Sequence, residues 1–435
     1  MGEGREARTL GRDPRRPTPL EKAVAVRVMP DNRAMNQGLG AIPLPLRIPA
    51  RWFWPIALGL GLLGLALVAT SPFYNFIDFP FFWSGGQTAG TPDLFDAALR
   101  AAWGAAHGLY LSPWVYPPGA AWLFVPFGLF PLPVAFWLHA AANVLLIAAS
   151  GLLGARVYGL DRRLGLVLAF AWTPCIASAI YGQNAPLALF LCLVTIEGLR
   201  RDSDWLAGLG AGLLLYKPTL ALPLLGLLVL RLRWRALLVV AVSAAAWYLA
   251  GVAAAVGDWG WPLTWLTSVG GWYQTDTAHN IVRTISMPGV LQGFGVPSFV
   301  ALGLGFVMAV LALPRLARAP LTEAAAGVVL VWLAVSPHAL NYEGALVLPV
   351  LLWALGGSGT GLREPARTWM VVGAIVLAPE YLFSETLGLS SLALITVAGS
   401  IVWIAGWWRL DAASRLSPEI CASDLLGRAA SERNG

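Results

Sequence analysis

The chain has 435 residues, of which 57% are hydrophobic and only 12% are charged. A soluble globular domain carries about 25% charged residues, so this composition excludes an ordinary soluble protein and indicates a chain surrounded mostly by lipid. The formal net charge is +6, but residues 1–51 hold ten Lys and Arg against five Asp and Glu, so the excess lies near the N-terminus and does not indicate nucleic-acid binding.

Residues 1–50 are polar, rich in Arg and interrupted by Pro. They lack the apolar core of a cleaved signal peptide and predict a disordered cytoplasmic tail. The sequence then predicts a transmembrane domain over residues 51–410 and a cytoplasmic C-terminal tail over residues 411–435.

Apolar stretches recur through residues 51–410. A crossing needs about 20 apolar residues, and several of these stretches are shorter. We therefore predict an all-α, polytopic helical bundle with about twelve transmembrane helices, within a range of about 10 to 13. The expected spans are residues 52–70, 134–156, 163–181, 184–199, 204–216, 218–230, 236–256, 289–313, 322–337, 343–356, 368–383 and 390–408.

Arginine clusters between the spans test this assignment. They are Arg156/Arg162/Arg163, Arg200/Arg201, Arg231/Arg233/Arg235, Arg315/Arg318, Arg363/Arg367 and Arg409. With a cytoplasmic N-terminus every cluster falls in the cytoplasm, as the positive-inside rule requires. The assignment needs residues 115–131 to be interfacial or re-entrant, and residues 204–230 to form a hairpin that turns at Lys217-Pro218, where proline breaks the helix.

The two long loops, residues 71–133 and 257–288, both fall on the outer side. Large loops on one face usually carry the function, so we expect the active site to face the periplasm or exterior of a multi-pass protein of the cell inner membrane. No internal repeat is detectable, and the inverted-repeat signature of transporters is therefore missing.

Asp78 directly follows the first expected span and lies among Phe, Ile and Pro. An ionised carboxylate at membrane depth is costly unless it is paired or used, so Asp78 is a candidate catalytic residue. The alternative is an interfacial charge that reaches water. Asp93 and Asp96 instead suggest the first turn of a helix that Thr91 caps.

Lys217 is one of two lysines in the chain, and the other is Lys22 in the tail. An ammonium is a compact charge that suits phosphate, so Lys217 is a candidate ligand of a substrate phosphate; the alternative is an interface anchor. Gln183 and Asn184 mark another outer turn, where their amides would bind a sugar or satisfy helix ends.

His338 opens a later outer turn, with Tyr342 and Glu343 nearby. Histidine donates a hydrogen bond in either protonation state, which suits a phosphate or hydroxyl, although a capped helix end is the alternative. His279 and Arg283 close the second long loop and are candidate substrate ligands, with Arg283 as an anion clamp.

No motif for a metal or a soluble nucleotide is present. Cys175, Cys192 and Cys421 are scattered and do not have metal or disulfide spacing. We therefore expect neither a metal nor a cofactor.

Several motifs in order resemble glycosyltransferase family 87 of the membrane-embedded GT-C class. They are DFPFFW at 78–83, YPPG at 116–119, YGQN at 181–184, KP at 217–218, RLRWRAL at 231–237 and SPH at 336–338. The resemblance covers about residues 52–410. It departs from some other GT-C branches, which have an acidic pair where this chain has one acid.

The resemblance implies transfer of a hexose, usually mannose, from a polyprenyl-phosphate donor to a lipid or glycan acceptor among membrane lipids. It also implies that Asp78 is the catalytic base. A phosphate leaving group needs a cation and not a general acid, so Lys217, His338 and Arg283 would neutralise it while the anomeric centre inverts. The rival hypothesis is a transporter or flippase of a lipid-linked solute.

Overall fold

The structure is a computed structural model that describes residues 59, 78–356, 364–378 and 390–406. All of them belong to one compact unit, residues 48–435. Within these ranges the chain is helical and has no strand, only one isolated β-bridge, so the all-α prediction is confirmed for the described part. The expected span 52–70 and both tails lie outside the described residues, apart from Gly59.

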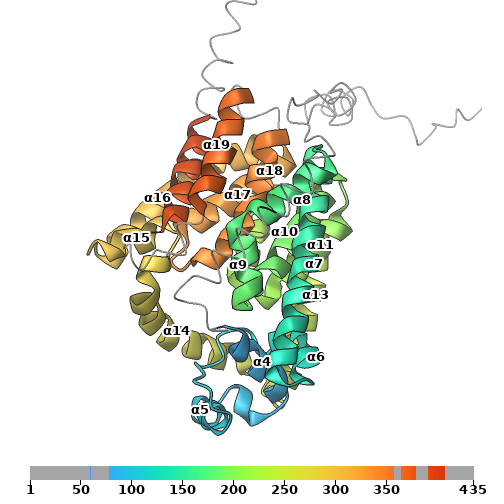
Figure 1. Cartoon of the computed structure of the whole chain (residues 1–435), viewed down its shortest axis with the longest axis vertical. Coiled ribbons are helices and arrows are strands. Elements are labelled where there is room, and N and C mark those ends of the chain that lie inside the picture. Colours follow the sequence, from blue (N-terminus) through green and yellow to red (C-terminus); the bar gives the residue numbers. More distant parts are fainter. Residues whose placement is uncertain (1–58, 60–77, 357–363, 379–389, 407–435) are drawn as a thin grey trace, which may run out of the picture. The chain divides into compact units, whose positions relative to one another are not determined.

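The helices follow one another with short connections (Figure 1). The first half comprises α4 (Phe79–Thr88), η1 (Pro92–Leu94), α5 (Ala97–Ala106), η2 (Pro118–Leu123), α6 (Val125–Gly128), α7 (Leu132–Tyr158), α8 (Arg162–Ala171), α9 (Thr173–Tyr181), α10 (Ala185–Arg200), α11 (Asp204–Leu213) and η3 (Leu214–Tyr216). The second half comprises α12 (Pro218–Leu230), α13 (Trp234–Ala254), α14 (Trp261–Asn280), η4 (Ile281–Arg283), α15 (Met287–Gly293), α16 (Ser298–Arg318), α17 (Leu321–Val335), η5 (Asn341–Val347), α18 (Leu348–Gly356) and α19 (Glu364–Leu377), and a further helix spans Ser391–Gly406.

Three of the described helices, α7, α13 and α16, are long and apolar enough to cross a membrane. Helices α8 and α9 together reach that length but are bent by 60°. The bend falls at Trp172, whose backbone is extended, because Pro174 has no N–H to continue the helical hydrogen bonds. These helices fit a membrane protein, whereas the count of twelve remains a prediction.

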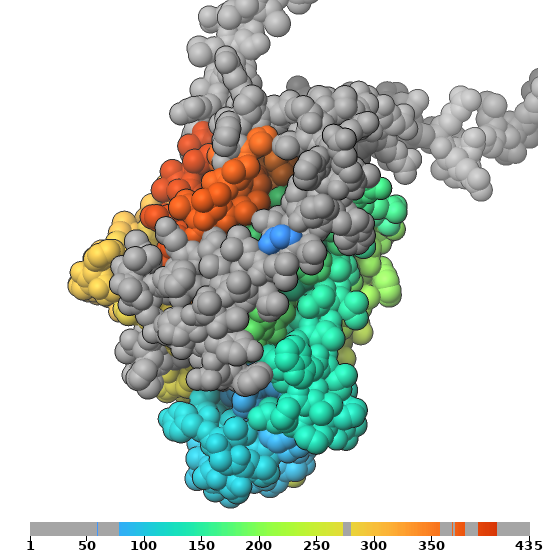
Figure 2. Space-filling model, viewed as in Figure 1, coloured from blue at the N-terminus to red at the C-terminus, as the bar shows by residue number. Residues whose placement is uncertain are grey.

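The outward face of α7 shows what surrounds the bundle. Helix α7 lies on the surface over much of its length (Figure 2). Its large apolar side chains Trp137 and Leu145 are 66% and 71% exposed. A soluble protein rarely exposes such a continuous apolar surface, so lipid is its natural environment.

Two element boundaries differ from the sequence prediction. The stretch 289–313 is not one helix, because α15 ends before Gly295, which has a left-handed φ of +81°, and α16 begins only after Pro297. Helix α5 is capped by Asp96, whose carboxylate accepts hydrogen bonds from two backbone N–H groups, and not by Thr91. Thr91 does precede η1, with Pro92 at its first position and Asp93 in its first turn as predicted, but the Thr91 side chain makes no capping hydrogen bond.

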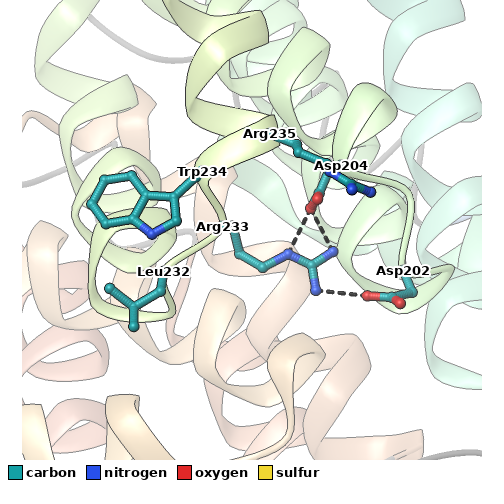
Figure 3. Close-up of a pocket in the computed structure, with 6 residues that line it drawn as sticks. All are labelled: Asp202, Asp204, Leu232, Arg233, Trp234 and Arg235. Carbon is teal, nitrogen blue, oxygen red and sulfur yellow. Dashed lines mark hydrogen bonds and ion pairs between the residues drawn. The ribbon is translucent and has the colours of Figure 1, made fainter. Parts of the chain in front are cut away.

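The predicted hairpin at residues 204–230 is confirmed by an ion pair between its two ends. Arg233, just beyond α12, lies 2.6 Å from the carboxylates of Asp202 and Asp204 at the start of α11 (Figure 3). The two helices therefore run in opposite directions, with Lys217 at their turn. Residues 115–131 contain only the short η2 and α6, which are too short to cross a bilayer.

Arginine side chains from separate helices meet at one end of the bundle. Glu197 on α10 is 3% exposed and pairs with Arg156, Arg200 and Arg201. The C-terminal ends of α12 and α16 and the N-terminal end of α17 lie in the same region. Arg231 donates to the backbone carbonyls of Leu316 and Ala319, and Arg315 pairs with Glu323. We call this region, with the pocket lined by Asp202, Asp204 and Arg233, the arginine end.

Candidate active site

The turns that carry the expected ligands lie at the other end of the same helices. Helix α10 begins after Asn184 and ends at Arg200, so its 16 residues separate the two by about 24 Å. Helix α11 starts at the arginine end and leads to Lys217, and α17 starts there and leads to the turn of His338. We call the turns at 182–184, 216–218 and 336–343, with Asp78 and Tyr116, the lysine end.

Lys217 is held by a carboxylate from a distant segment. Its Nζ lies 2.7 Å from Oε1 of Glu343 on η5. Both residues are buried, with 8% and 4% of their surface exposed. The rings of Tyr116 and Tyr342 also face the ammonium, with centroids 5.8 and 5.1 Å away. The Lys217 charge is thus compensated inside the protein.

Gln183 and Asn184 have a fixed backbone and side-chain atoms that lack a hydrogen bond of regular geometry. The Asn143 amide donates to the carbonyl of Gln183 at 2.8 Å, and the Tyr216 hydroxyl donates to the carbonyl of Asn184 at 3.0 Å. Both residues are at least 96% buried. Oε1 of Gln183 and both amide atoms of Asn184 nevertheless make no hydrogen bond of regular geometry. Buried amides in this state are candidate ligand groups.

Gly182 brings the start of α4 against these amides. Its φ is +75°, a conformation that favours glycine, and it closes α9. A Cβ there would lie 2.3 Å from the Cβ of Phe79. The ring of Phe79 is in turn buried against Phe136 and His139 of α7. Asp78, the residue before Phe79, is therefore held next to the turn of Gln183.

The pKa of Tyr116 responds both to Asp78 and to the ion pair of Lys217 and Glu343. Burial raises the pKa of the Tyr116 hydroxyl, while the Lys217 charge and the nearby Asn184 amide oppose the rise. The carboxylates of Glu343 and Asp78 raise that pKa further. One hydroxyl thus responds to the charges of all three ionisable groups, so Lys217, Glu343 and Asp78 lie within electrostatic range of Tyr116.

The segments that contain Arg283 and His338 are joined by the described β-bridge. Thr284 pairs with Leu340, and the Ile285 N–H donates to the carbonyl of Ala339 at 2.9 Å. The ring of Trp272 on α14 meets the ring of His338 edge-on at 5.8 Å. The side chain of His279 lies outside the described residues.

The structure therefore brings Asp78, Gln183, Asn184 and Lys217 together, with the segment of Arg283 and His338 beside them. Sequence reasoning gave no role to Glu343 or Tyr116. The signal for Glu343 was available, because a buried lysine needs a counter-charge, but its partner lies 126 residues away along the chain. In the described part of the chain no three metal-ligating side chains are grouped.

The profile of glycosyltransferase family 87 matches residues 114–337, about half of the chain. The chain belongs to glycosyltransferase family 87. The matched region contains Tyr116, Gln183, Asn184, Lys217 and Arg283. As a member of this family, with helices that fit a membrane, the protein is a membrane glycosyltransferase.

A curated relative in Corynebacterium glutamicum is an alpha-(1->3)-arabinofuranosyltransferase. The two chains are 25% identical over 336 residues, which cover 67% of this chain and 75% of the relative. No solved structure matches the chain.

Proposed function

We propose that this family 87 protein transfers a sugar from a polyprenyl-phosphate donor to a lipid or glycan acceptor at the outer face of the cell inner membrane. The observation that carries the proposal is the grouping of Asp78 and Lys217 around Tyr116 at the lysine end. A carboxylate that takes a proton and a cation that stabilises the leaving phosphate are the two groups that such a transfer needs.

In the proposed reaction Asp78 accepts the proton of the acceptor hydroxyl as its oxygen attacks the anomeric carbon. The bond between that carbon and the phosphate oxygen breaks, and the electron pair leaves with the phosphate. Lys217, His338 and Arg283 stabilise the departing charge. Attack opposite the phosphate inverts the anomeric centre. This differs from glycoside hydrolysis, where a second carboxylate serves the leaving group or the water.

The buried amides have a separate proposed role. Gln183 and Asn184 offer one donor and two acceptor atoms that make no regular hydrogen bond inside the protein. Sugar hydroxyls would satisfy these atoms, and an unsatisfied buried amide penalises a substrate that lacks the matching hydroxyl. We also include His279 among the substrate-binding residues, because it lies four residues before Arg283 in the sequence.

Two classes of sugar are candidates for the transferred group. The family resemblance favours mannose, whereas the relative in Corynebacterium glutamicum is named for transfer of arabinofuranose. Both sugars would leave the same phosphate and use the same base. Family membership favours either transfer over the rival hypothesis of a flippase.

The test is to incubate the purified chain in nanodiscs with polyprenyl-phosphate mannose or polyprenyl-phosphate arabinofuranose and membrane lipids. We expect a glycosylated product with one of the two donors, and product formation about 10²–10⁴-fold slower when Asp78 is replaced by Asn. A folded protein that moves donor between leaflets without forming product would contradict the proposal and support the flippase.

A further inference from the structure

Glu343 connects two turns of the lysine end with one carboxylate. Its Oε1 lies 2.7 Å from Nζ of Lys217, and its Oε2 accepts a hydrogen bond from the backbone N–H of Leu340 at 3.3 Å. Leu340 lies two residues after His338 and pairs with Thr284 in the β-bridge. One side chain thus joins Lys217 to the segment of His338.

The surroundings of Lys217 require this partner. Its titratable neighbours are Tyr116 from the loop after α5 and Tyr342 and Glu343 from η5, and the uncharged Asn184 lies on the turn before α10. The carboxylate of Glu343 lies at ion-pair distance from the ammonium. A buried ammonium without a counter-charge is strongly disfavoured.

The protonation of Lys217 depends on the same contact. Burial by itself lowers the pKa of Lys217, but Glu343 and the Tyr116 hydroxyl outweigh burial and raise it. Glu343 is the largest of the contributions that oppose burial, so without its carboxylate the pKa of Lys217 should fall. The lysine would then lose its proton, and with it the positive charge, at a lower pH.

We propose that Glu343 is a positioning residue for glycosyl transfer, which keeps the Lys217 ammonium charged and fixed beside the His338 segment for the phosphate of the donor. The inference rests on the proposed function, because it takes Lys217 as the group that meets the phosphate. An ammonium has three N–H donors, so the contacts with Glu343 and the Tyr116 hydroxyl leave one for a phosphate oxygen. Glu343 need not touch the donor.

The test measures binding of farnesyl phosphate to the full chain in nanodiscs between pH 7 and pH 9.5. A phosphate monoester is already doubly ionised in this range, so its own charge stays constant. We expect the affinity of the unchanged protein to stay flat, and that of Glu343→Gln to fall at least about tenfold as the pH rises.

Glu323→Gln is the matched control. Glu323 is also 4% exposed and lies 2.7 Å from its cation, Arg315, but it belongs to the arginine end. We expect this variant to bind farnesyl phosphate with the flat profile of the unchanged protein. A flat profile for Glu343→Gln, or the same pH-dependent loss in Glu323→Gln, would overturn the inference.

A double variant keeps the test decisive if Glu343→Gln does not fold. Lys217→Met with Glu343→Gln buries no charge at this position, so it should fold and bind weakly at every pH. A pH-dependent loss in this variant would remove Lys217 as the titrating group and overturn the inference. Failure of the unchanged protein to bind farnesyl phosphate would instead contradict the proposed donor class.

Discussion

The two ends of the bundle both contain a buried ion pair, and they differ in what surrounds it. At the arginine end the acids are saturated: Glu197 pairs with three arginines and Glu323 with Arg315. At the lysine end, the amides of Gln183 and Asn184 retain polar atoms without regular hydrogen bonds. Saturated buried charges hold helices together, whereas unsatisfied buried groups indicate a place for a ligand.

The choice of cation follows the same division. Arginine forms planar, two-pronged bonds, as Arg233 does between Asp202 and Asp204 (Figure 3). The described cation that faces Tyr116 and Glu343 is a lysine, which is a compact charge with three movable donors. Arg233 therefore links α11 to the start of α13, and the lysine end is the described region that we propose for the phosphate.

The largest effect should come from Asp78→Asn, which keeps shape but removes basicity. General-base catalysis contributes about 10²–10⁴-fold, so turnover should fall by that factor. Binding of farnesyl phosphate should survive, because the base does not meet the phosphate. Steady-state transfer assays and binding titrations on the same preparation give the comparison, and transfer at the unchanged rate would exclude Asp78 as the base.

Breaking the ion pair between Arg315 and Glu323 at the arginine end should lower the stability of the fold and leave the turnover rate unchanged. Glu323→Gln removes the carboxylate partner of buried Arg315, which costs about 3–5 kcal/mol in comparable buried pairs. Thermal unfolding should show the loss, while turnover per folded molecule should match the unchanged protein. A large fall in turnover at full folding would mean that the two ends are not functionally distinct.

Lys217→Met should weaken both donor binding and turnover. Hydrogen bonds to charged groups contribute about 1.5–3 kcal/mol, so we expect losses of about 10–100-fold. The variant with Lys217→Met and Glu343→Gln controls for the unpaired carboxylate that the single change leaves. Unchanged donor affinity in both variants would show that Lys217 is an anchor and not a phosphate ligand.

The smallest effect should come from Gln183→Leu. One hydrogen bond to a sugar hydroxyl contributes about 0.5–1.5 kcal/mol, which corresponds to a loss of about 2–10-fold in kcat/KM. Gln292→Leu on α15 is the control, because that amide accepts from Ser298 and lies outside the lysine end. Equal losses in the two variants would count against sugar recognition by Gln183.

Local features of the fold could be predicted where the sequence itself contains the cause. Proline after Lys217 and the arginine clusters on both sides of 204–230 were enough to predict the hairpin, because a single crossing would leave one cluster outside. The bend at Trp172 was missed, because the apolar run 163–181 conceals a proline that stops one helix and starts another. The break near Gly295 was missed because the apolar run 289–313 likewise contains a proline, Pro297, directly before the second helix.

The candidate site was predictable residue by residue but not as a set of contacts. Asp78, Gln183, Asn184 and Lys217 are polar groups in apolar surroundings, and their cost indicated a role. The pairing of Lys217 with Glu343 depends on how distant helices pack, which no periodicity records. Roles for these residues remain predictions until the variants are measured.

The central claim, that the lysine end binds the donor phosphate, can be tested most directly by photolabelling. A farnesyl phosphate analogue with a diazirine close to the phosphate would be irradiated with the full chain, and the labelled peptides identified by mass spectrometry. We expect adducts at 182–184, 216–218 and 336–343, and their loss when unlabelled farnesyl phosphate competes. Competable adducts concentrated at 200–204 and 231–235 would contradict the account.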